Sequence, residues 1–282
     1  MATGSAFFDS TRGRHIFEQW WRPAAEPRAV VAICHGFAEH SGRYADVASY
    51  LNGRGYAVEG LDLRGHGLSD GTRVFVRSFN EYLNDLGRFV RNVRQRNPGS
   101  PVFLLGHSMG GGVATLFVLV RRPELAGVIL SGPALQMGGP KQPLHRQLMF
   151  ATMGLLPWLR LPPLPAGAVS RDPEVVRRYE EDPLVYRGGP TVGLARAGLR
   201  ASKRIFRDME RFELPLLIVH GTDDRLVTTS GSEELHARAQ SPDKALKLYD
   251  GLFHEVLNEP ERLDVLGDIA DWLDSHTPAG QE

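Results

Sequence analysis

The sequence of 282 residues holds a single cysteine, Cys34, so no disulfide can form within the chain. Neither sign of charge is in excess, because 33 Lys and Arg residues balance 33 Asp and Glu residues, and nothing indicates a nucleic-acid partner. The first residues show neither the basic nor the apolar stretch of a secretory signal, and no uninterrupted apolar run approaches the length of a membrane span. These absences favour a cytoplasmic protein.

Patterns typical of metal binding are missing as well. The chain has ten histidines, but no His-x-x-x-His pair falls on a predicted helix, so we expect neither a metal nor another cofactor. A cluster of arginines at helical spacing predicts the solvated face of a helix rather than a binding patch. Its members are Arg88, Arg91, Arg94 and Arg96.

Short apolar runs alternate with helical patterns from Arg28 onward, which predicts an α/β fold with a mostly parallel central sheet and helices on both faces. The expected parallel strands are 29–34, 56–61, 102–105, 125–130, 214–219 and 245–249. An antiparallel hairpin is expected at the edge of this sheet, formed by 7–9 and 15–21. Two capping boxes predict helix starts, namely Ser78 with Glu81 and Asn258 with Glu261.

The alternating pattern breaks between about Ala134 and Ser202, where prolines and glycines punctuate short helical pieces. We expect a single domain over 1–282, with a cap, or lid, inserted at 134–202. A densely apolar stretch of this cap has two interpretations: an ordinary buried helix, or a lid whose apolar face contacts lipid aggregates or a membrane surface. The candidate substrate contacts in this stretch are Met149, Phe150, Leu155 and Trp158.

The most informative stretch of the chain is Gly106-His107-Ser108-Met109-Gly110, a Gly-x-Ser-x-Gly motif. It follows an apolar run and precedes a predicted buried helix, which is the strand–turn–helix context that the motif requires. Such a sharp turn strains the backbone, and glycines on both sides avoid clashes with the neighbouring strand and helix. The hydroxyl of Ser108 then projects above the edge of the sheet, which predicts a nucleophilic serine.

A serine hydroxyl is a weak nucleophile unless a base removes its proton and an acid orients that base. In this architecture the order along the chain is serine, acid, histidine. The acid is expected after strand 214–219, where either Asp223 or Asp224 qualifies, and the base is expected after the last strand, where His254 stands. Because ligands bind beyond the carboxyl ends of parallel strands, these side chains can converge on Ser108.

Hydrolysis through a serine also needs two backbone N–H donors for the oxyanion. We expect them from Met109, directly after the nucleophile, and from Phe37, in the loop after the first long strand, where Gly36 lets the backbone approach. His107, inside the motif, is expected to point away from the nucleophile and to give structural support.

Together these motifs resemble the monoacylglycerol lipase family of α/β hydrolases, over nearly the whole chain. The matching segments are 35–40, 62–69, 106–111, 170–175, 182–185, 221–226 and 253–254. In the acid loop of this family, the aspartate before the arginine is the triad member, which implies Asp224 rather than Asp223. One departure is Ala38, where the family usually has glycine.

The resemblance implies a serine-dependent enzyme that cleaves a glycerol ester carrying one long acyl chain, whereas the residues alone imply only an ester. A lysophospholipase or a broad carboxylesterase with the same triad is the alternative. A dehalogenase or an epoxide hydrolase is disfavoured, since those enzymes need a carboxylate where Ser108 stands. The intact set of Ser108, Asp224 and His254 also disfavours a ligand-binding protein on the same scaffold. We expect a lipid ester as the partner, with peripheral membrane contact through the cap; the sequence does not indicate an oligomeric state.

Overall fold

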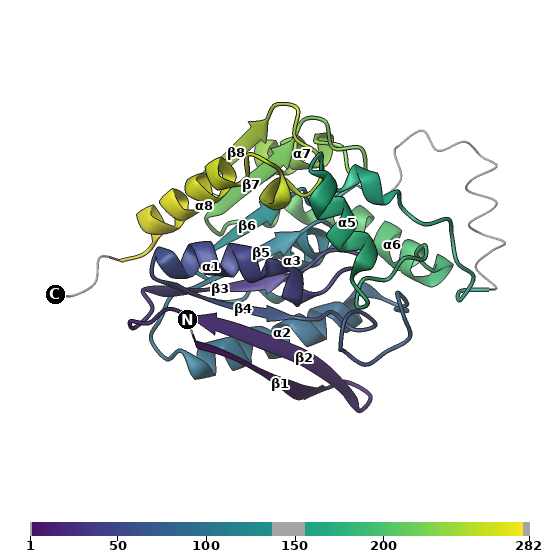
Figure 1. Ribbon diagram of the computed structural model, residues 1–282, viewed down its shortest axis with the longest axis horizontal. Helices are drawn as coiled ribbons and strands as arrows, with labels where there is room; N and C mark the ends of the chain where they lie inside the picture. Colours follow the sequence, from purple (N-terminus) through teal and green to yellow (C-terminus); the bar gives the residue numbers. More distant parts are fainter. Residues whose placement is uncertain (1, 137–155, 279–282) are drawn as a thin grey trace.

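The computed structural model describes residues 2–136 and 156–278, and its centre is an eight-stranded sheet of order β1-β2-β4-β3-β5-β6-β7-β8 (Figure 1). The strands are β1 (Ala2–Ser10), β2 (Arg14–Arg22), β3 (Ala29–Cys34), β4 (Tyr56–Leu61), β5 (Val102–His107), β6 (Gly127–Ser131), β7 (Leu216–Gly221) and β8 (Lys244–Tyr249). Strands β3 to β8 pair in parallel, while β1 with β2 and β2 with β4 are antiparallel. The predicted mostly parallel α/β sheet is therefore confirmed.

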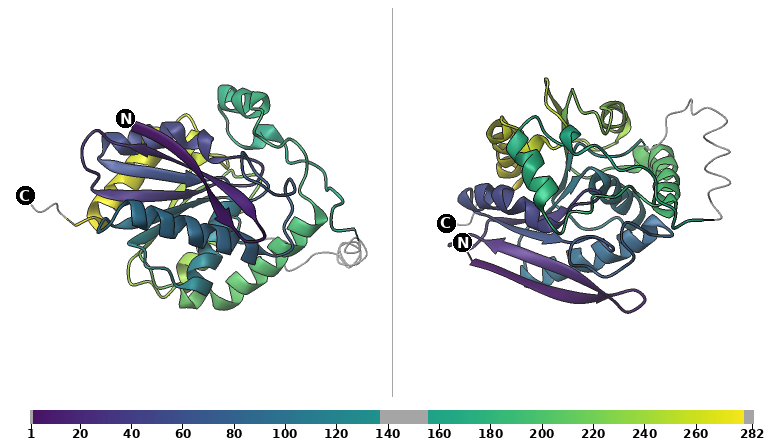
Figure 2. Two further views of the ribbon diagram at one scale, coloured as in Figure 1. Left: turned by 90° about the horizontal axis from the view of Figure 1, so that it is seen from below. Right: turned by 45° about the vertical axis from the view of Figure 1, so that its right-hand side comes forward.

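Helices cover both faces of this sheet (Figures 1 and 2). One face carries α1 (Ala45–Gly53) and α8 (Arg262–His276); the other carries α2 (Phe79–Arg96), α3 (Met109–Arg121), α6 (Val192–Asp208) and α7 (Ser230–Arg238). Alternation along β3 divides the core in two, because Val30, Ala32 and Cys34 pack in one apolar cluster and Val31 and Ile33 in the other. Two buried layers of this kind explain why the strands read as continuous apolar runs.

The predicted hairpin forms at the edge of the sheet, where β1 and β2 pair along their full lengths from Ala2 with Arg22 to Ser10 with Arg14. Its turn holds Arg12 and Gly13 with positive φ of 63° each, as a tight connection between antiparallel strands requires. Figure 2 shows this hairpin running across one end of the sheet. It therefore covers the edge that β4 would otherwise expose.

Of the two helix starts predicted from capping boxes, one is found in the structure and the other is not. Ser78 is the N-cap of α2 and accepts a hydrogen bond from Asn80 N, so this prediction is confirmed. The reciprocal bond differs by one residue, since Glu81 Oε1 accepts from Arg77 N rather than from Ser78 N. The prediction for the last helix is wrong, because Asn258 belongs to the short helix η5 (Val256–Asn258) and α8 begins only at Arg262.

Between β6 and β7 the chain leaves the sheet and forms the segment expected to be a cap. Its described part contains the short helix η3 (Ala166–Ala168), α5 (Pro173–Glu181) and most of α6. Helix α5 has no buried residue, whereas α6 contributes Ala197, Ala201 and Ile205 to the core, and the expected boundary at 202 falls inside α6. Among the residues of 2–136 and 156–278, no helix is both long and apolar enough to cross a membrane.

Candidate active site

Ser108 lies on the turn between β5 and α3, with φ 52° and ψ −121°. Positive φ is strained for a residue with a Cβ, and the flanking glycines show why this conformation persists. A Cβ on Gly106 would lie 2.8 Å from the Ala114 Cβ, and one on Gly110 would lie 2.1 Å from the Cys34 carbonyl oxygen. Strand β3 and helix α3 therefore leave room for nothing larger than glycine on either side of the serine.

The structure brings the expected base and acid to this turn. His254 Nε2 lies 2.8 Å from Ser108 Oγ, and His254 Nδ1 lies 2.6 Å from Asp224 Oδ2. Asp224 and His254 follow β7 and β8 respectively, so three segments far apart in the sequence meet at the carboxyl edge of the sheet. Asp223, the other candidate acid, is exposed.

The carboxylate of Asp224 is buried, and both of its oxygens have hydrogen-bond partners. Its Oδ1 accepts the backbone N–H groups of Leu226 and Val227, each at 2.8 Å, while its Oδ2 faces the imidazoles of His254 and His220. Burial alone would raise the pKa of Asp224, but the hydrogen bonds from His220 and His254 outweigh it and hold that pKa well below the ordinary range. Asp224 is therefore ionised at neutral pH.

His107 does not point away from the site, so this expectation is wrong. Its ring centroid lies 4.9 Å from that of His254, and its Nδ1 lies 3.0 Å from the Ser131 carbonyl oxygen, which acts as acceptor for an Nδ1 proton. Burial, with the neighbouring His254, lowers the pKa of His107 to about 4. A neutral His107 thus packs against the base without adding a second positive charge.

The expected oxyanion donors have different surroundings. Phe37 lines the cavity that contains Ser108 and His254, while Met109, which is not among its lining residues, is the first residue of α3. The first amides of a helix have no acceptor inside that helix, so the Met109 N–H is free to face the turn. Gly36 approaches the serine closely, since a Cβ there would lie 3.0 Å from the Ser108 Cβ.

Ala38, the departure from the family pattern, has φ 68° and is buried. This left-handed conformation favours glycine, so an alanine is strained there in a way that a glycine would not be. The Ala38 carbonyl accepts a hydrogen bond from Tyr186 N at 2.8 Å, so the loop after β3 is tied to the segment between α5 and α6.

A buried ion cluster beside the site was not predicted from the sequence. Arg43 donates to Glu39 at 2.8 Å and forms a bidentate salt bridge with Glu255, the residue after His254. Glu39 also accepts the Gly36 N–H at 2.6 Å. Burial alone would raise the pKa of each carboxyl, but Arg43 lowers both pKa values below their usual range. A glutamate directly after the base, in an otherwise apolar loop, was the signal that could have revealed this cluster.

The cavity that contains Ser108 has a volume of only about 30 Å³. The segment 164–169 and Tyr179 of α5 form its wall on the side of the expected cap. Trp158, an expected substrate contact, is 64% exposed and lines a separate groove with Phe75 and Pro157. The other expected contacts, Met149, Phe150 and Leu155, lie outside the described residues.

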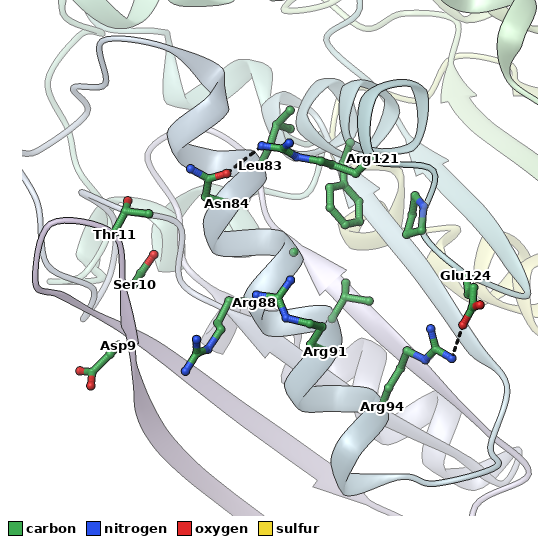
Figure 3. A pocket seen from close by; sticks show the side chains of 14 residues that line it. Asp9, Ser10, Thr11, Leu83, Asn84, Arg88, Arg91, Arg94, Arg121 and Glu124 are labelled. Carbon is green, nitrogen blue, oxygen red and sulfur yellow. Dashed lines mark hydrogen bonds and ion pairs between the residues drawn. The ribbon is translucent and has the colours of Figure 1, made fainter.

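A larger cavity of about 820 Å³ lies away from this site, between α2, α3 and the tip of the hairpin (Figure 3). Arg88 and Arg91 line it, together with Arg121, which donates to Asn84, and Arg94, which pairs with Glu124. Arg88, Arg91 and Arg94 are exposed, as predicted for the solvated face of α2, but the prediction is wrong for Arg96, which is half-buried and pairs with Glu18 and Glu59. Residues of this cavity do not reach Ser108, so volume alone would have indicated the wrong place for the chemistry.

A serine hydroxyl, an imidazole and a carboxylate in one hydrogen-bonded chain are the parts of a nucleophilic hydrolase. Here they stand at the carboxyl edge of a mostly parallel sheet, with the serine on a strand-to-helix turn. In the part of the chain that the structure describes, no group of three or more His, Cys, Asp or Glu residues could hold a metal ion. Fold and site therefore define a serine hydrolase of the α/β-hydrolase class.

Comparisons with known proteins narrow this class. A family model described as serine aminopeptidase, S33, matches residues 25–261. The monoacylglycerol lipase of Mycolicibacterium smegmatis is 40% identical over 269 residues, covering 95% of this chain and 96% of that protein. The human monoglyceride lipase is 35% identical, covering 94% of this chain and 88% of that protein. The crystal structure of the Paleococcus ferrophilus monoacylglycerol lipase has a TM-score of 0.80 at 31% identity and covers 98% of this chain and 100% of that one.

The chain belongs to the monoacylglycerol lipase family, within the wider serine aminopeptidase S33 family of hydrolases. The predicted family, the α/β-hydrolase fold and the class of enzyme, a carboxylic ester hydrolase, are confirmed.

Proposed function

We propose that this chain hydrolyses monoacylglycerols to a fatty acid and glycerol, with Ser108 as nucleophile, His254 as base and Asp224 as the acid that orients it. The observation that carries the assignment is the continuous chain of hydrogen bonds from Ser108 through His254 to Asp224, at 2.8 and 2.6 Å. The substrate follows from relatives named as monoacylglycerol lipases that match this chain over nearly its whole length.

The reaction has two halves. Ser108 Oγ attacks the ester carbonyl while its proton passes to His254 Nε2, and the imidazolium is stabilised by Asp224 at Nδ1. Collapse of the tetrahedral intermediate breaks the bond to the glycerol oxygen, which takes the proton from His254 and leaves as an alcohol. Water then gives a proton to His254 and attacks the acyl-enzyme, which releases the fatty acid and restores the serine.

Negative charge develops on the carbonyl oxygen in both halves of the reaction. We propose that the backbone N–H groups of Phe37 and Met109 stabilise this charge by donating hydrogen bonds to the oxygen. The hydrogen bond from Gly36 N to Glu39 supports this role for Phe37, because it fixes the loop immediately before the proposed donor. Losing one such donor typically lowers kcat by roughly 100- to 1,000-fold.

A cap over the site is part of the proposal, with 134–202 as the inserted segment of a single domain. The cavity of about 30 Å³ beside Ser108 has room for little more than a water molecule. A long acyl chain therefore enters only after the wall formed by 164–169 and Tyr179 has moved.

The substrate assignment predicts a distinct rate profile. For equal acyl chains, kcat/KM for a monoacylglycerol is expected to exceed that for the di- and triacylglycerol and for the lysophospholipid by at least about tenfold, the effect of roughly 1.4 kcal/mol in transition-state binding. Initial rates over this series, and over acyl chains from short to long, are the measurement. A higher rate with the lysophospholipid, or a preference for short acyl chains, would replace this assignment with a lysophospholipase or a general carboxylesterase.

We also propose peripheral contact between the cap and lipid aggregates. Large apolar side chains gather in the described part of the cap and stand exposed to solvent: Leu156 (47%), Trp158 (64%), Leu159 (42%) and Leu164 (50%). Burying such side chains in a lipid surface recovers roughly 25 cal/mol per Å² of apolar area.

Replacing both Trp158 and Leu159 with serine is expected to lower the rate on emulsified monoacylglycerol about tenfold and to leave hydrolysis of a water-soluble short-chain ester unchanged. The reason is the loss of exposed apolar area that binds the aggregate. Leu263→Ser is the matched control, because Leu263 is 61% exposed on α8, outside the cap. Equal rates on the emulsion for both variants would exclude this contact.

A further inference from the structure

Two imidazoles share one oxygen of the proposed catalytic acid. Asp224 Oδ2 lies 2.6 Å from His254 Nδ1 and 3.1 Å from His220 Nε2. The two histidines belong to different segments, because His220 lies within β7 and His254 follows β8. His254 acts as the base in the proposed reaction, whereas His220 takes no part in its proton transfers.

The hydrogen-bond partners of His220 define its tautomer. Its Nδ1 lies 2.8 Å from the Oγ of Ser232, a fully buried residue of α7. A hydroxyl on Nδ1 can donate its proton there, which leaves the ring proton on Nε2. This Nε2–H then faces Asp224 Oδ2 at 3.1 Å and the Val227 carbonyl oxygen at 3.2 Å. His220 is thus a donor to the carboxylate, as His254 is.

The location of His220 suits a residue that holds another in place. It is fully buried in β7, which pairs with a strand on each side, whereas Asp224 belongs to the irregular segment that follows this strand. The other bonds to the carboxylate, from Leu226 N and Val227 N, both go to Oδ1 and arise within the same turn. His220 is therefore the link between the oxygen that faces the base and the rigid sheet.

We propose that His220 is a positioning residue of this hydrolase, which fixes Asp224 Oδ2 against His254 through an Nε2–H bond, and that Ser232 sets the tautomer required. The relay then runs from Ser232 through His220, Asp224 and His254 to Ser108. This inference rests on the proposed function of the Ser108, His254 and Asp224 set.

The test compares His220→Leu, which removes the donor, with His220→Gln, whose amide N–H can replace it. We expect kcat of the leucine variant to fall by about 10- to 100-fold at unchanged KM, the range in which loss of a hydrogen bond to a metal-ligating side chain lowers activity. The glutamine variant should stay within threefold of the wild type in kcat. His236→Gln is the matched control, because His236 lies near the end of α7 and is only partly buried.

Several results would overturn the inference. A folded leucine variant with wild-type kcat, or a glutamine variant that loses as much activity as the leucine variant, would each do so. If His220→Leu does not fold, Ser232→Ala takes its place, with an expected severalfold loss of kcat; wild-type kcat in a folded Ser232→Ala variant would count against the relay.

A second readout separates this inference from the substrate assignment. The rate at which a fluorophosphonate labels Ser108 depends on the activated nucleophile and not on the natural substrate. Wild-type protein that is labelled but does not cleave monoacylglycerols would contradict the proposed function alone. Slower labelling of His220→Leu than of the wild type would still support the positioning role, and equal labelling rates would exclude it.

Discussion

Ser108→Ala is expected to lower kcat for ester hydrolysis by roughly 10⁶-fold, the scale seen when the nucleophile of a serine hydrolase is removed. The alanine variant lacks the oxygen that forms the acyl-enzyme, and His254 Nε2, 2.8 Å away, loses the group that it deprotonates. The fold should persist, because alanine has the same Cβ and meets the same positive φ at this turn. Steady-state rates with a monoacylglycerol, together with thermal unfolding, provide the measurement.

Ser275→Ala serves as the control for this substitution, since Ser275 is exposed near the end of α8 and far from the site in the sequence and in the fold. It should keep wild-type rates. A folded Ser108→Ala variant that retains more than about one-hundredth of the wild-type kcat would contradict the role given to this serine.

Asp224→Asn is expected to lower kcat by about 10⁴-fold with little change in KM. An asparagine amide in this position presents an N–H group toward the Nδ1 of His254 and favours the wrong tautomer of the imidazole, so Nε2 can no longer accept the serine proton. The side chain keeps its size, and its oxygen can still accept from Leu226 and Val227 N–H, so the turn should remain intact. Rates and the pH profile of kcat/KM are the measurements.

The neighbouring aspartate supplies a matched control. Asp223 is exposed and one residue away, so Asp223→Asn removes the same charge without touching the imidazole. We expect it to stay within about twofold of the wild-type kcat, in keeping with the small effect of most surface substitutions. A large loss in Asp223→Asn with a small one in Asp224→Asn would transfer the role to Asp223.

Sequence patterns predicted the sheet and its active edge because the local requirements there are strict. A serine between Gly106 and Gly110, after an apolar run, is compatible with few other structures, and the close approach of Cys34 O to Gly110 explains the glycine. Strand limits were less well defined: β6 and β7 each begin two residues later than predicted, since apolar residues also continue into the loops before them.

Side chains that depend on tertiary contacts could not be placed from the sequence. Both Asp223 and Asp224 follow β7, and the residues alone did not separate them, because the choice depends on which carboxylate accepts hydrogen bonds from the N–H groups of Leu226 and Val227. Likewise, the orientation of His107 depends on Ser131 of the neighbouring strand. No periodicity encodes either contact.

The start of the last helix was predicted wrongly for a similar reason. Asn258 and Glu261 have the spacing of a capping box, but both side chains have partners elsewhere. Asn258 Nδ2 donates to Glu255, in the buried cluster around Arg43, and Glu261 accepts from Arg171. A local hydrogen bond of Asn258 and a long-range ion pair of Glu261 therefore outweighed a cap that is worth about 1 kcal/mol.

The central claim is that Ser108 carries an activated hydroxyl, and covalent labelling tests it most directly. Wild-type protein treated with a fluorophosphonate should gain the mass of one label, which peptide mass spectrometry should locate on Ser108, and Ser108→Ala should gain none. Folded wild-type protein that stays unlabelled, or that carries the label on a different residue, would contradict the account.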